Sequence, residues 1–410
     1  MRRLLVIFMF AALAGFGFAQ GTLTLEQNKP EIDAALKTYA ATWGTANNVQ
    51  VTIKSVGGGS GSDLGKQLQA DYAAGDMPDI FVIDGPESYK QWQSIILDLS
   101  SQPWVKHTSV AFKMDDKVYG FPVSIEGWGL AYNADILRKA GVNPATLVDY
   151  AAYARAFAKI DSMKKELGID SVVSMAASMD MEWVTADHDF NALLSNGLKY
   201  GDKSVTNDLL AGKVDPQRLR QYADWVALLF KYADKSILTT GNYDAQVGAF
   251  ATGKAAFLHQ GNWVDPNLAQ AKVHFKMGFA PYGSLKEPTH GIFVAAPSYY
   301  VINSQSKNIA AAKKFLDDLV FTEAGQKYIV QKAGMIPAFS NIKLKPTGQL
   351  SEAVQAYAAA GKIYSWNQYD FSNDFRQKTL GPIYNLFAMG QIDETKFIDL
   401  MTQAFQGLKQ

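Results

Sequence analysis

The chain has 410 residues, which is too long for one ordinary hydrophobic core, so we expect two domains. Its 39 basic and 39 acidic residues cancel and 48% of its residues are hydrophobic, which excludes a disordered chain and argues against nucleic acid or an anionic membrane surface as a partner. The absence of cysteine excludes disulfides, thiol nucleophiles, cysteine-ligated metals and a lipid-modified cysteine at the start of a mature chain.

The first segment, "MRRLLVIFMFAALAGFGFAQG", has the form of a secretory signal peptide. Two arginines precede a short apolar run at 4–13, and Gly17 and Ala19 are the small residues expected before a cleavage site. The apolar run is shorter than the roughly 20 residues that span a bilayer, so a retained membrane anchor is the weaker alternative. We therefore expect residues 1–19 to be a signal peptide cleaved after Ala19, which leaves a soluble exported protein that is periplasmic in a double-membraned bacterium.

Strand and helix patterns alternate over the first part of the mature chain. Residues 22–27, 49–56 and 78–84 read as strands, and residues 29–44 and 62–76 between them read as helices. This β-α-β-α-β order predicts a mostly parallel sheet in an α/β domain.

The middle of the chain, roughly 133–280, is richer in helix, and 215–234 shows the pattern best. Asp215 is placed to cap this helix and Pro216 occupies its first position. One apolar stripe follows at helical spacing, formed by Leu219, Tyr222, Val226 and Leu229.

Another strand-like run covers 292–303, and helices are expected at 308–320 and over the C-terminal residues 393–410. We find no internal repeat and no long low-complexity linker. Two domains without a linker are consistent with domains that are each assembled from separated stretches of chain.

Motifs for nucleotides, metals and hydrolytic triads are missing. The glycine-rich loop 56–65 lacks the residues of a phosphate-binding loop, so we interpret it as a flexible turn or as a loop whose free N–H groups face a ligand. None of the five histidines forms a metal-binding pair on a helix, and no G-x-S-x-G motif occurs. We therefore expect no cofactor and no metal.

Aromatic residues give the clearest functional signal. Four tryptophans stand beside polar residues in glycine-broken stretches rather than on helical stripes: Trp128, Trp183, Trp263 and Trp366. A tryptophan with an apolar face and a polar end suits a cleft, where its ring stacks on a sugar while neighbouring acids and amides bind the hydroxyls. For any single tryptophan, partial burial in the core is the alternative.

Four stretches, in order, carry a resemblance that covers nearly the whole mature chain. They are "LQADYAAGDMPDIFVIDG", "KVYGFPVSIEGWGLAYNADILRKAG", "VGAFATGKAAFLHQGNW" and "AAKKFLDDLVFTEAGQKYIVQKAGMIPA". In these stretches the chain resembles the family 1 extracellular solute-binding proteins, the sugar-binding components of ABC importers that are distantly similar to maltose-binding protein. The closing "AAGKIYSWNQYDF" is more similar to the branch that binds oligosaccharides of the raffinose type.

The resemblance implies a two-lobed periplasmic binding protein fold of type II, with the ligand cleft between two α/β lobes. It implies three crossings between the lobes, which we place near Ser124, near His290 and near Pro337. The expected first lobe is 20–124 with 291–337, and the expected helix-rich second lobe is 125–290 with 338–410.

The resemblance also implies the ligand-binding residues. Glu126 and Trp128 are expected at the cleft wall just past the first crossing, where Gly127 and Gly129 would let the backbone and the ligand approach closely. For Glu126 the alternative is a structural salt bridge between the lobes. The full expected set is Glu26, Gln27, Asp84, Glu126, Trp128, Trp183, Asn262, Trp263 and Trp366.

The function implied by the resemblance is binding with hinge closure. A sugar, expected to be an oligosaccharide, would shift the lobes from open to closed, and a membrane permease would recognise the closed monomer. Two other classes stay open at this point. An exported carbohydrate-active hydrolase would use the same aromatics and carboxylates, and the same fold could bind a polyamine, a peptide or an anion.

Overall fold

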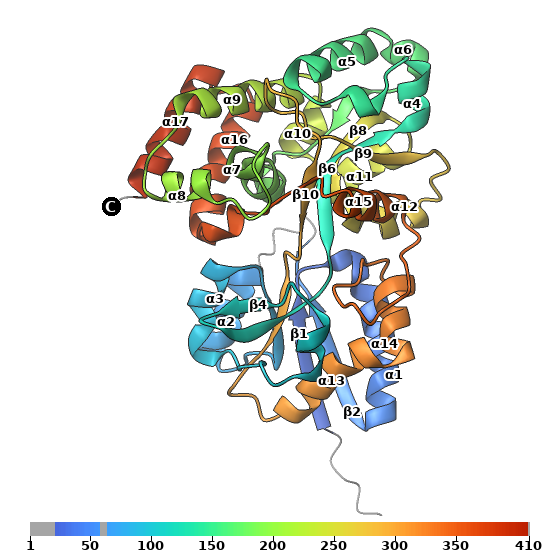
Figure 1. Ribbon diagram of the computed structural model, residues 1–410, viewed down its shortest axis with the longest axis vertical. Coiled ribbons are helices and arrows are strands. Elements are labelled where there is room, and N and C mark those ends of the chain that lie inside the picture. Colours follow the sequence, from blue (N-terminus) through green and yellow to red (C-terminus); the bar gives the residue numbers. More distant parts are fainter. Residues whose placement is uncertain (1–20, 58–63, 409–410) are drawn as a thin grey trace, which may run out of the picture.

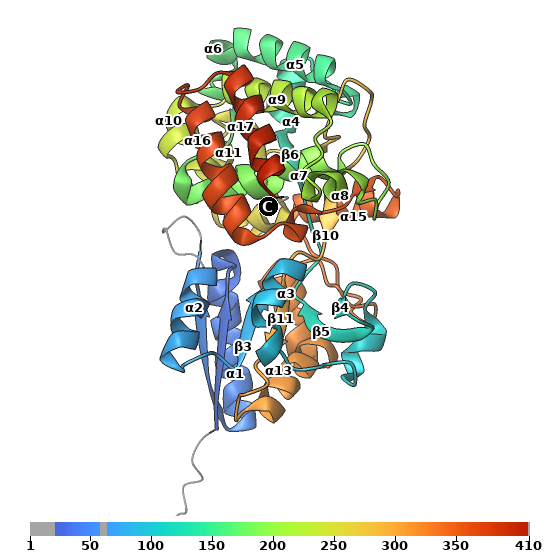
Figure 2. The ribbon, with the colours of Figure 1, turned by 90° about the vertical axis from the view of Figure 1, so that its left-hand side faces the viewer.

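Two α/β lobes lie end to end in the computed structural model, which describes residues 21–57 and 64–408, and extended segments join them at a narrow waist (Figure 1; Figure 2). The two-lobed α/β architecture predicted from the sequence is thereby confirmed. The predicted signal peptide and the centre of the glycine-rich loop lie outside the described residues.

The sheet of the first lobe is parallel in one half and antiparallel in the other. Within the described residues its strands are, in spatial order, β2 (Val49–Ser55), β1 (Gly21–Gln27), β3 (Ile80–Ile83), β11 (Tyr299–Ile302), β5 (Lys117–Pro122) and β4 (Phe112–Met114). β1 pairs in parallel with β2 and β3, as the β-α-β-α-β order predicts, whereas β11, β5 and β4 join in antiparallel order. The prediction of a mostly parallel sheet therefore holds only for the half that contains the first strands.

Helices cover both faces of this sheet. They are α1 (Asp33–Asn47), α2 (Leu64–Ala74), α3 (Pro86–Trp92), α13 (Ile309–Phe321) and α14 (Glu323–Lys327). Leu36 of α1 and Phe315 of α13 are buried on one face, while Leu68 of α2 and Trp92 of α3 are buried on the other. The helix expected at 29–44 begins one turn late, after a 3₁₀ turn, and ends where Asn48 adopts a left-handed conformation, as helix ends commonly do.

The sheet of the second lobe is built around β6. In spatial order its described strands are β12 (Ile363–Tyr364), β10 (Ile292–Ala295), β6 (Glu126–Asn133), β8 (Ala255–Gly261) and β7 (Ser171–Ser174), while β9 (Met277–Ala280) pairs with the far half of β6. β6 is buried along nearly all of its length, which explains why "EGWGLAYN" reads as an apolar run.

The second lobe is helix-rich. Its described α-helices are α4 (Ala134–Lys139), α5 (Tyr150–Ser162), α6 (Lys164–Leu167), α7 (Phe190–Ser195), α8 (Ser204–Leu210), α9 (Pro216–Lys231), α10 (Lys235–Thr240), α11 (Tyr243–Ala251), α12 (Asp265–Gln270), α15 (Gln349–Ala359), α16 (Gly381–Ala388) and α17 (Glu394–Gly407). α9 confirms its sequence signature: the Asp215 carboxylate accepts two first-turn backbone N–H groups at 2.8 and 3.2 Å, and the predicted stripe is buried.

The strand-like run 292–303 is divided between the two lobes. Its first half is β10, which pairs with β6 and β12 of the second sheet, and its second half is β11 of the first sheet. Pro297 stands between them and has no N–H with which to continue a ladder. This corrects the expectation that 291–337 belongs to the first lobe, because the chain returns to the first sheet only after Ala295.

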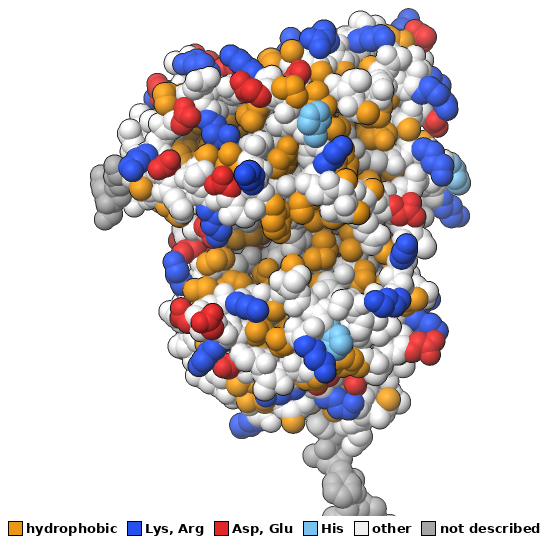
Figure 3. Space-filling model, in the orientation of Figure 1, with side chains coloured by type: hydrophobic (Ala, Val, Ile, Leu, Met, Phe, Trp, Pro, Cys, Tyr) orange, Lys and Arg blue, Asp and Glu red, His pale blue; other side chains and the backbone are white. Residues whose placement is uncertain are grey.

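The segments that join the lobes are hydrogen-bonded to one another. The first passes from β5 to β6, and its Val123 N–H donates to the carbonyl of Ser298, which lies on the segment from β10 to β11, at 3.0 Å. Ile125 N–H donates at 2.9 Å to the carbonyl of Ile336, on the segment that leads from α14 toward α15. The waist is therefore a bonded bundle of extended chain, and hydrophobic side chains gather over it in Figure 3.

Candidate ligand-binding site

A cavity of about 830 Å³ lies between the lobes and takes its walls from both. Its size is near the upper end of the range for small-molecule sites. The first lobe contributes mainly charged and polar groups, and the second lobe contributes most of the large aromatic rings together with charged and polar groups of its own.

The wall of the first lobe is formed where its parallel strands end. Asn28, Lys29 and Glu31 follow β1, while Asp84 and Gly85 follow β3. The carboxyl ends of parallel strands meet at one edge of a sheet, so these groups come together at the cavity. A side-chain carbon at Gly85 would lie 2.8 Å from Cβ of Tyr369 in the second lobe, so the lobes touch here and leave no room for a larger residue.

The wall of the second lobe carries five large aromatic rings. Trp183, Trp263 and Trp366 line the cavity with Tyr243 and Tyr369. The three tryptophans surround the ring of His188, whose centroid lies 4.9 Å from that of Trp263, 5.3 Å from that of Trp183 and 5.4 Å from that of Trp366.

The rings of this wall are placed by local structure. Trp263 follows Gly261, whose missing side chain leaves the space into which the indole folds back, and its Nε1–H donates to Gln260 Oε1 at 2.8 Å. Trp183 opens a short π-helix, Trp183–Asp189, which also carries His188 to the cavity. Such π-helical turns are rare and occur frequently at functional sites.

Two buried ion pairs stand at the cavity. Lys29 Nζ of the first lobe lies 2.5 Å from Glu126 Oε1 of the second, and the Ser124 hydroxyl donates to the same oxygen at 2.7 Å. The donors of the Glu126 carboxylate therefore include a cation from the opposite lobe, as the salt-bridge alternative required. Within the second lobe, the Arg376 guanidinium pairs with the Asp187 carboxylate.

Burial shifts the protonation of several wall residues. Burial raises the pKa of Asp84 to about 6. The positive charge of Arg376 lowers this pKa, and the negative charge of Asp187 raises it further. Burial also raises the pKa of Glu31 to about 7, against the opposing charge of Lys29. Burial, assisted by His259, lowers the pKa of His188 well below its usual 6.5, so this imidazole is neutral at pH 7 and offers one donor and one acceptor.

Five of the nine residues expected to bind ligand line the cavity. They are Asp84, Glu126, Trp183, Trp263 and Trp366. The fold brings these five residues to one cavity although Asp84 and Trp366 lie 282 positions apart in the sequence.

The structure places the remaining four behind the walls. Trp128 is fully buried and stacks on Phe293 with a centroid separation of 4.2 Å. Asn262 accepts the backbone N–H of Gly127 at 2.8 Å and donates to the Ser351 hydroxyl at 3.1 Å, so it braces the start of β6. Both correct the expected position at the cleft wall.

Glu26 and Gln27 are also behind the wall. The Glu26 carboxylate turns toward Lys54 on β2, 3.3 Å away. Gln27 bonds its side chain to the backbone of Lys29 and to the Ser55 hydroxyl, which fixes the loop that presents Lys29. Successive side chains of a strand point to opposite faces, so a residue that is close to the cleft in the sequence need not point into it.

Gly127 also has a different role from the one expected. A side-chain carbon at this position would lie 2.5 Å from Cγ2 of Val354 on α15. The bare backbone therefore makes room for a helix of the same lobe rather than for a ligand.

Sequence reasoning missed Lys29, Glu31, His188, Tyr369 and Arg376, all of which line the cavity. The position of Lys29 and Glu31 just after the first strand was a usable signal, because that edge of the sheet faces the ligand. Nothing in the local sequence distinguishes Arg376, which follows a loop and lies 189 positions from its partner Asp187.

A pair of α/β lobes around a cavity lined by aromatic rings and by charged groups is the arrangement expected of a receptor for a small polar solute. The sequence agrees: the profile of the family described as bacterial extracellular solute-binding protein matches residues 34–362. The chain belongs to this family.

Named relatives include sugar-binding proteins. The chain is 22% identical over 399 residues to the multiple sugar-binding protein of Streptococcus mutans serotype c, covering 91% of this chain and 88% of the relative. It is 25% identical over 339 residues to the maltooligosaccharide ABC transporter solute-binding lipoprotein of Streptococcus pneumoniae strain R6, covering 81% and 74% of the two chains. Among solved structures, the solute-binding protein RafE in complex with raffinose superposes with a TM-score of 0.78 at 18% identity, over 95% of this chain and 100% of the other.

Among the helices within 21–57 and 64–408, none combines the length and the apolar character needed to cross a membrane.

Proposed function

We propose that this protein captures an oligosaccharide outside the cytoplasmic membrane and delivers it to the permease of an ABC importer by closing its lobes. The observation that carries the proposal is one cavity between the lobes whose lining combines large aromatic rings with carboxylates from both lobes. The flat rings of Trp183, Trp263 and Trp366 suit the C–H faces of sugar rings, and the carboxylates of Asp84 and Glu126 suit their hydroxyls. The names of the relatives, which include a multiple sugar-binding and a maltooligosaccharide-binding protein, agree with this ligand class.

Closure follows from the division of the walls between the lobes. A ligand that contacts both lobes only when they are together shifts the population toward the closed form. In this proposal the hinge lies at the segments near Val123, Ser298 and Ile336, whose backbones are hydrogen-bonded at the waist between the lobes. The closed monomer is the form that the permease recognises.

The proposed activity is binding without turnover. A hydrolase would require a carboxylic acid and a carboxylate that flank the bond to be cut. Here Glu126 and Asp187 are each engaged by a cation, which favours the role of a fixed acceptor for these two. We assign Asp84 and Glu31, whose pKa values burial raises, to hydrogen bonding with the ligand and not to proton transfer. A polyamine is the competing ligand, because aromatic rings and carboxylates also bind cations.

One experiment separates these classes. The purified mature protein is tested by calorimetry against raffinose, stachyose, maltotetraose, glucose and spermidine, and each mixture is then examined for cleaved sugar. We expect heat of binding from at least one oligosaccharide, weaker or no binding of glucose, and an unchanged sugar after prolonged incubation. Binding of spermidine alone would replace the ligand class, and release of smaller sugars would replace the binding function.

Export is part of the same proposal. Removal of the leader after Ala19 would leave a mature chain that begins at Gln20 and is free in the periplasm. The intact mass of the protein recovered from the periplasm measures this directly, and a mass that includes Met1 would contradict it.

A further inference from the structure

A single helical rod carries much of the aromatic wall. The π-helix Trp183–Asp189 continues without a break into α7 (Phe190–Ser195). Toward the cavity the rod presents Trp183, Asp187 and His188. Any shift or rotation of the rod would therefore move these side chains together.

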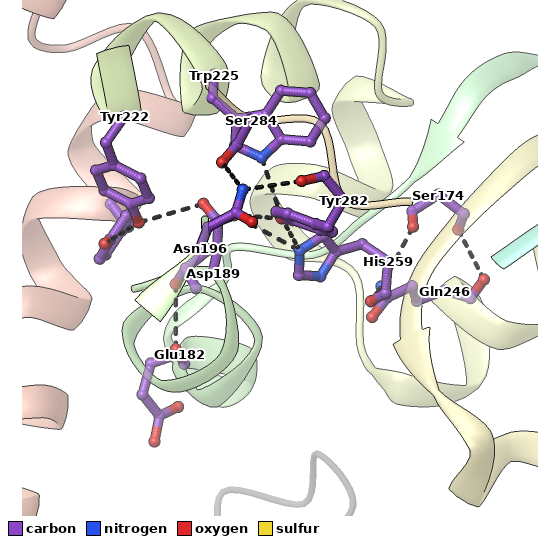
Figure 4. Close-up of polar contacts among 12 residues, drawn as sticks. Ser174, Glu182, Asp189, Asn196, Tyr222, Trp225, Gln246, His259, Tyr282 and Ser284 are labelled. Carbon is purple, nitrogen blue, oxygen red and sulfur yellow. Dashed lines mark hydrogen bonds and ion pairs between the residues drawn. The ribbon is translucent and has the colours of Figure 1, made fainter. Parts of the chain in front are cut away.

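The last residue of the π-helix anchors the rod on the side away from the cavity. Asp189 is fully buried, and its Oδ1 accepts the Tyr282 hydroxyl at 2.8 Å while its Oδ2 accepts the Tyr222 hydroxyl at 3.3 Å (Figure 4). His259 Nε2 lies 3.6 Å from Oδ1 and 2.9 Å from the Tyr282 hydroxyl. Because Tyr222 comes from α9 and His259 from β8, this one carboxylate ties the rod to separate elements of the lobe.

The α7 half of the rod fixes the third tryptophan. Asn191 Nδ2 and the Ser195 hydroxyl both donate to the carbonyl of Ser365, at 2.8 and 2.7 Å. The backbone N–H of Asn367 donates to Asn191 Oδ1 at 2.7 Å. These bonds grip the chain on both sides of Trp366, so the position of this ring also follows the rod.

It needs explaining why the rod is held by a buried carboxylate, Asp189, and not by apolar packing alone. A buried carboxylate costs free energy unless donors satisfy it, and apolar residues of similar volume often stabilise a core as well or better. What hydrogen bonds add is direction, since they hold a group at one position and orientation. A ring that must already stand in the right place when the ligand arrives benefits from such fixing, because less freedom is lost on binding.

We propose that Asp189, with Tyr222 and Tyr282, is a positioning network for the binding site, which holds the rod so that Trp183, Trp263 and Trp366 form a preorganised wall around His188. None of the three network residues lines the cavity, so they act through the rod and not on the ligand. The inference rests on the proposed function in that the wall is taken to be the ligand's stacking surface.

The test replaces the network residues and observes the rings first without ligand. Tyr282→Phe removes the hydroxyl that Asp189 accepts, and Asp189→Asn removes one acceptor oxygen. Tyr357→Phe is the matched control, because it deletes a hydroxyl in the same lobe that donates to the Phe279 carbonyl at 3.0 Å, away from the rod. Each protein is labelled with fluorotryptophan, and the fluorine resonances are assigned by single tryptophan-to-phenylalanine changes.

We expect the resonances of Trp183, Trp263 and Trp366 to shift or broaden in both network variants. Those of Trp43 and Trp104, which lie in the core of the first lobe, should stay unchanged, and Tyr357→Phe should leave all five resonances as in the wild type. Folded network variants in which the three wall resonances are unchanged would overturn the proposal. If Asp189→Asn does not fold, Tyr282→Phe and Tyr222→Phe decide it.

The second readout is affinity, with raffinose, stachyose and maltotetraose as probes. We expect each network variant to weaken binding roughly tenfold, and Tyr357→Phe to change it by less than about twofold. Equal losses of affinity in the network and control variants would show a merely structural role. Failure of every probe to bind the wild type would count against the proposed function alone, and the fluorine spectra would still decide the positioning role.

Discussion

The two walls of the cavity are built by different means. The first lobe presents short loops at the ends of parallel strands, with Lys29, Glu31 and Asp84 at their tips. The second lobe presents rings from a π-helix, a 3₁₀ turn and loops, among them Trp183, Trp263 and Trp366. One wall thus follows from a general property of α/β sheets, and the other depends on irregular structure.

The difference has a chemical side. The wall of the first lobe can change its charge near neutral pH, because burial raises the pKa of both Glu31 and Asp84. On the wall of the second lobe, burial lowers the pKa of His188 well below 6.5, so this imidazole stays neutral in the same range. We infer that the contribution of ring stacking to the affinity for ligand does not change with pH, and that the contribution of the polar groups of the first lobe does.

The largest expected effect is on the free energy of unfolding, and it distinguishes a tryptophan in the core from one on the wall of the cavity. Trp128→Ala should lower the free energy of unfolding by about 3 to 5 kcal/mol, because a fully buried ring stacked on Phe293 is lost. Trp263→Ala should lower it less but weaken sugar binding by about 1 to 3 kcal/mol, because its ring is partly exposed to the cavity.

Urea denaturation and calorimetry on both variants measure this contrast. Equal affinity in wild type and Trp263→Ala would place Trp263 with the core. A stable Trp128→Ala variant that loses only affinity would return Trp128 to the wall.

A smaller effect is expected where the walls meet. Glu126→Gln should lower the stability of the ligand-free protein by about 1 to 3 kcal/mol, because the buried Lys29 ammonium keeps an amide oxygen as acceptor but loses the charge that it faces at 2.5 Å. The ligand-free lobes should also open further, which small-angle X-ray scattering detects as a larger radius of gyration.

The double variant Lys29→Met with Glu126→Gln completes the cycle. If the pair holds the lobes together, the two single changes will be strongly non-additive in melting temperature. Losses that appear only when sugar is present would instead make Glu126 a pure ligand contact, as the sequence first suggested.

The smallest effect is on pH dependence. Asp84 has a pKa of about 6 in the folded protein and 3.8 as its ordinary value, so between these limits the folded state binds more protons than the unfolded state. Its contribution to stability is therefore greatest below pH 4, declines as the pH rises toward 6 and is level above it. Asp84→Asn should flatten this decline in urea midpoints measured from pH 4 to 8, and Glu31→Gln should flatten the part that extends toward pH 7. An unchanged profile in both variants would show that the polar wall does not titrate in this range.

The contrast between the walls also explains what could be predicted from the sequence. Strands, helices and the edge at which Asp84 lies follow from hydrophobic periodicity and from the common behaviour of parallel strands, so the position of the first wall could be predicted, although only Asp84 among its residues was. The second wall was found only as a set of tryptophans. The polar residues beside them in the sequence identified them as candidates, but the same criterion also selected Trp128, which is in the core.

The errors have a common physical origin. Gln27 and Asn262 use their side-chain amides to hold the backbone of the residues at and behind the wall. A residue that supports a site in this way is of the same type as one that contacts the ligand, so the sequence does not distinguish the two roles. The division of the run 292–303 was missed because two buried strands in different sheets are both apolar and read as one. The Arg376–Asp187 pair depends on contact across 189 positions, which no local pattern encodes.

The hydrogen bond between Val123 and Ser298 has a mechanical consequence. It continues the pairing of β5 with β11 toward that of β10 with β6, so two of the joining segments run through the waist as one short antiparallel ribbon. The cross-strand hydrogen bonds of an antiparallel pair lie perpendicular to the strands, so sliding one segment past the other would stretch them, whereas bending the pair out of its plane would leave them largely intact. If the lobes close as proposed, this ribbon would favour one axis of rotation over the others and would bring the two walls of the cavity together in the same register at each closure.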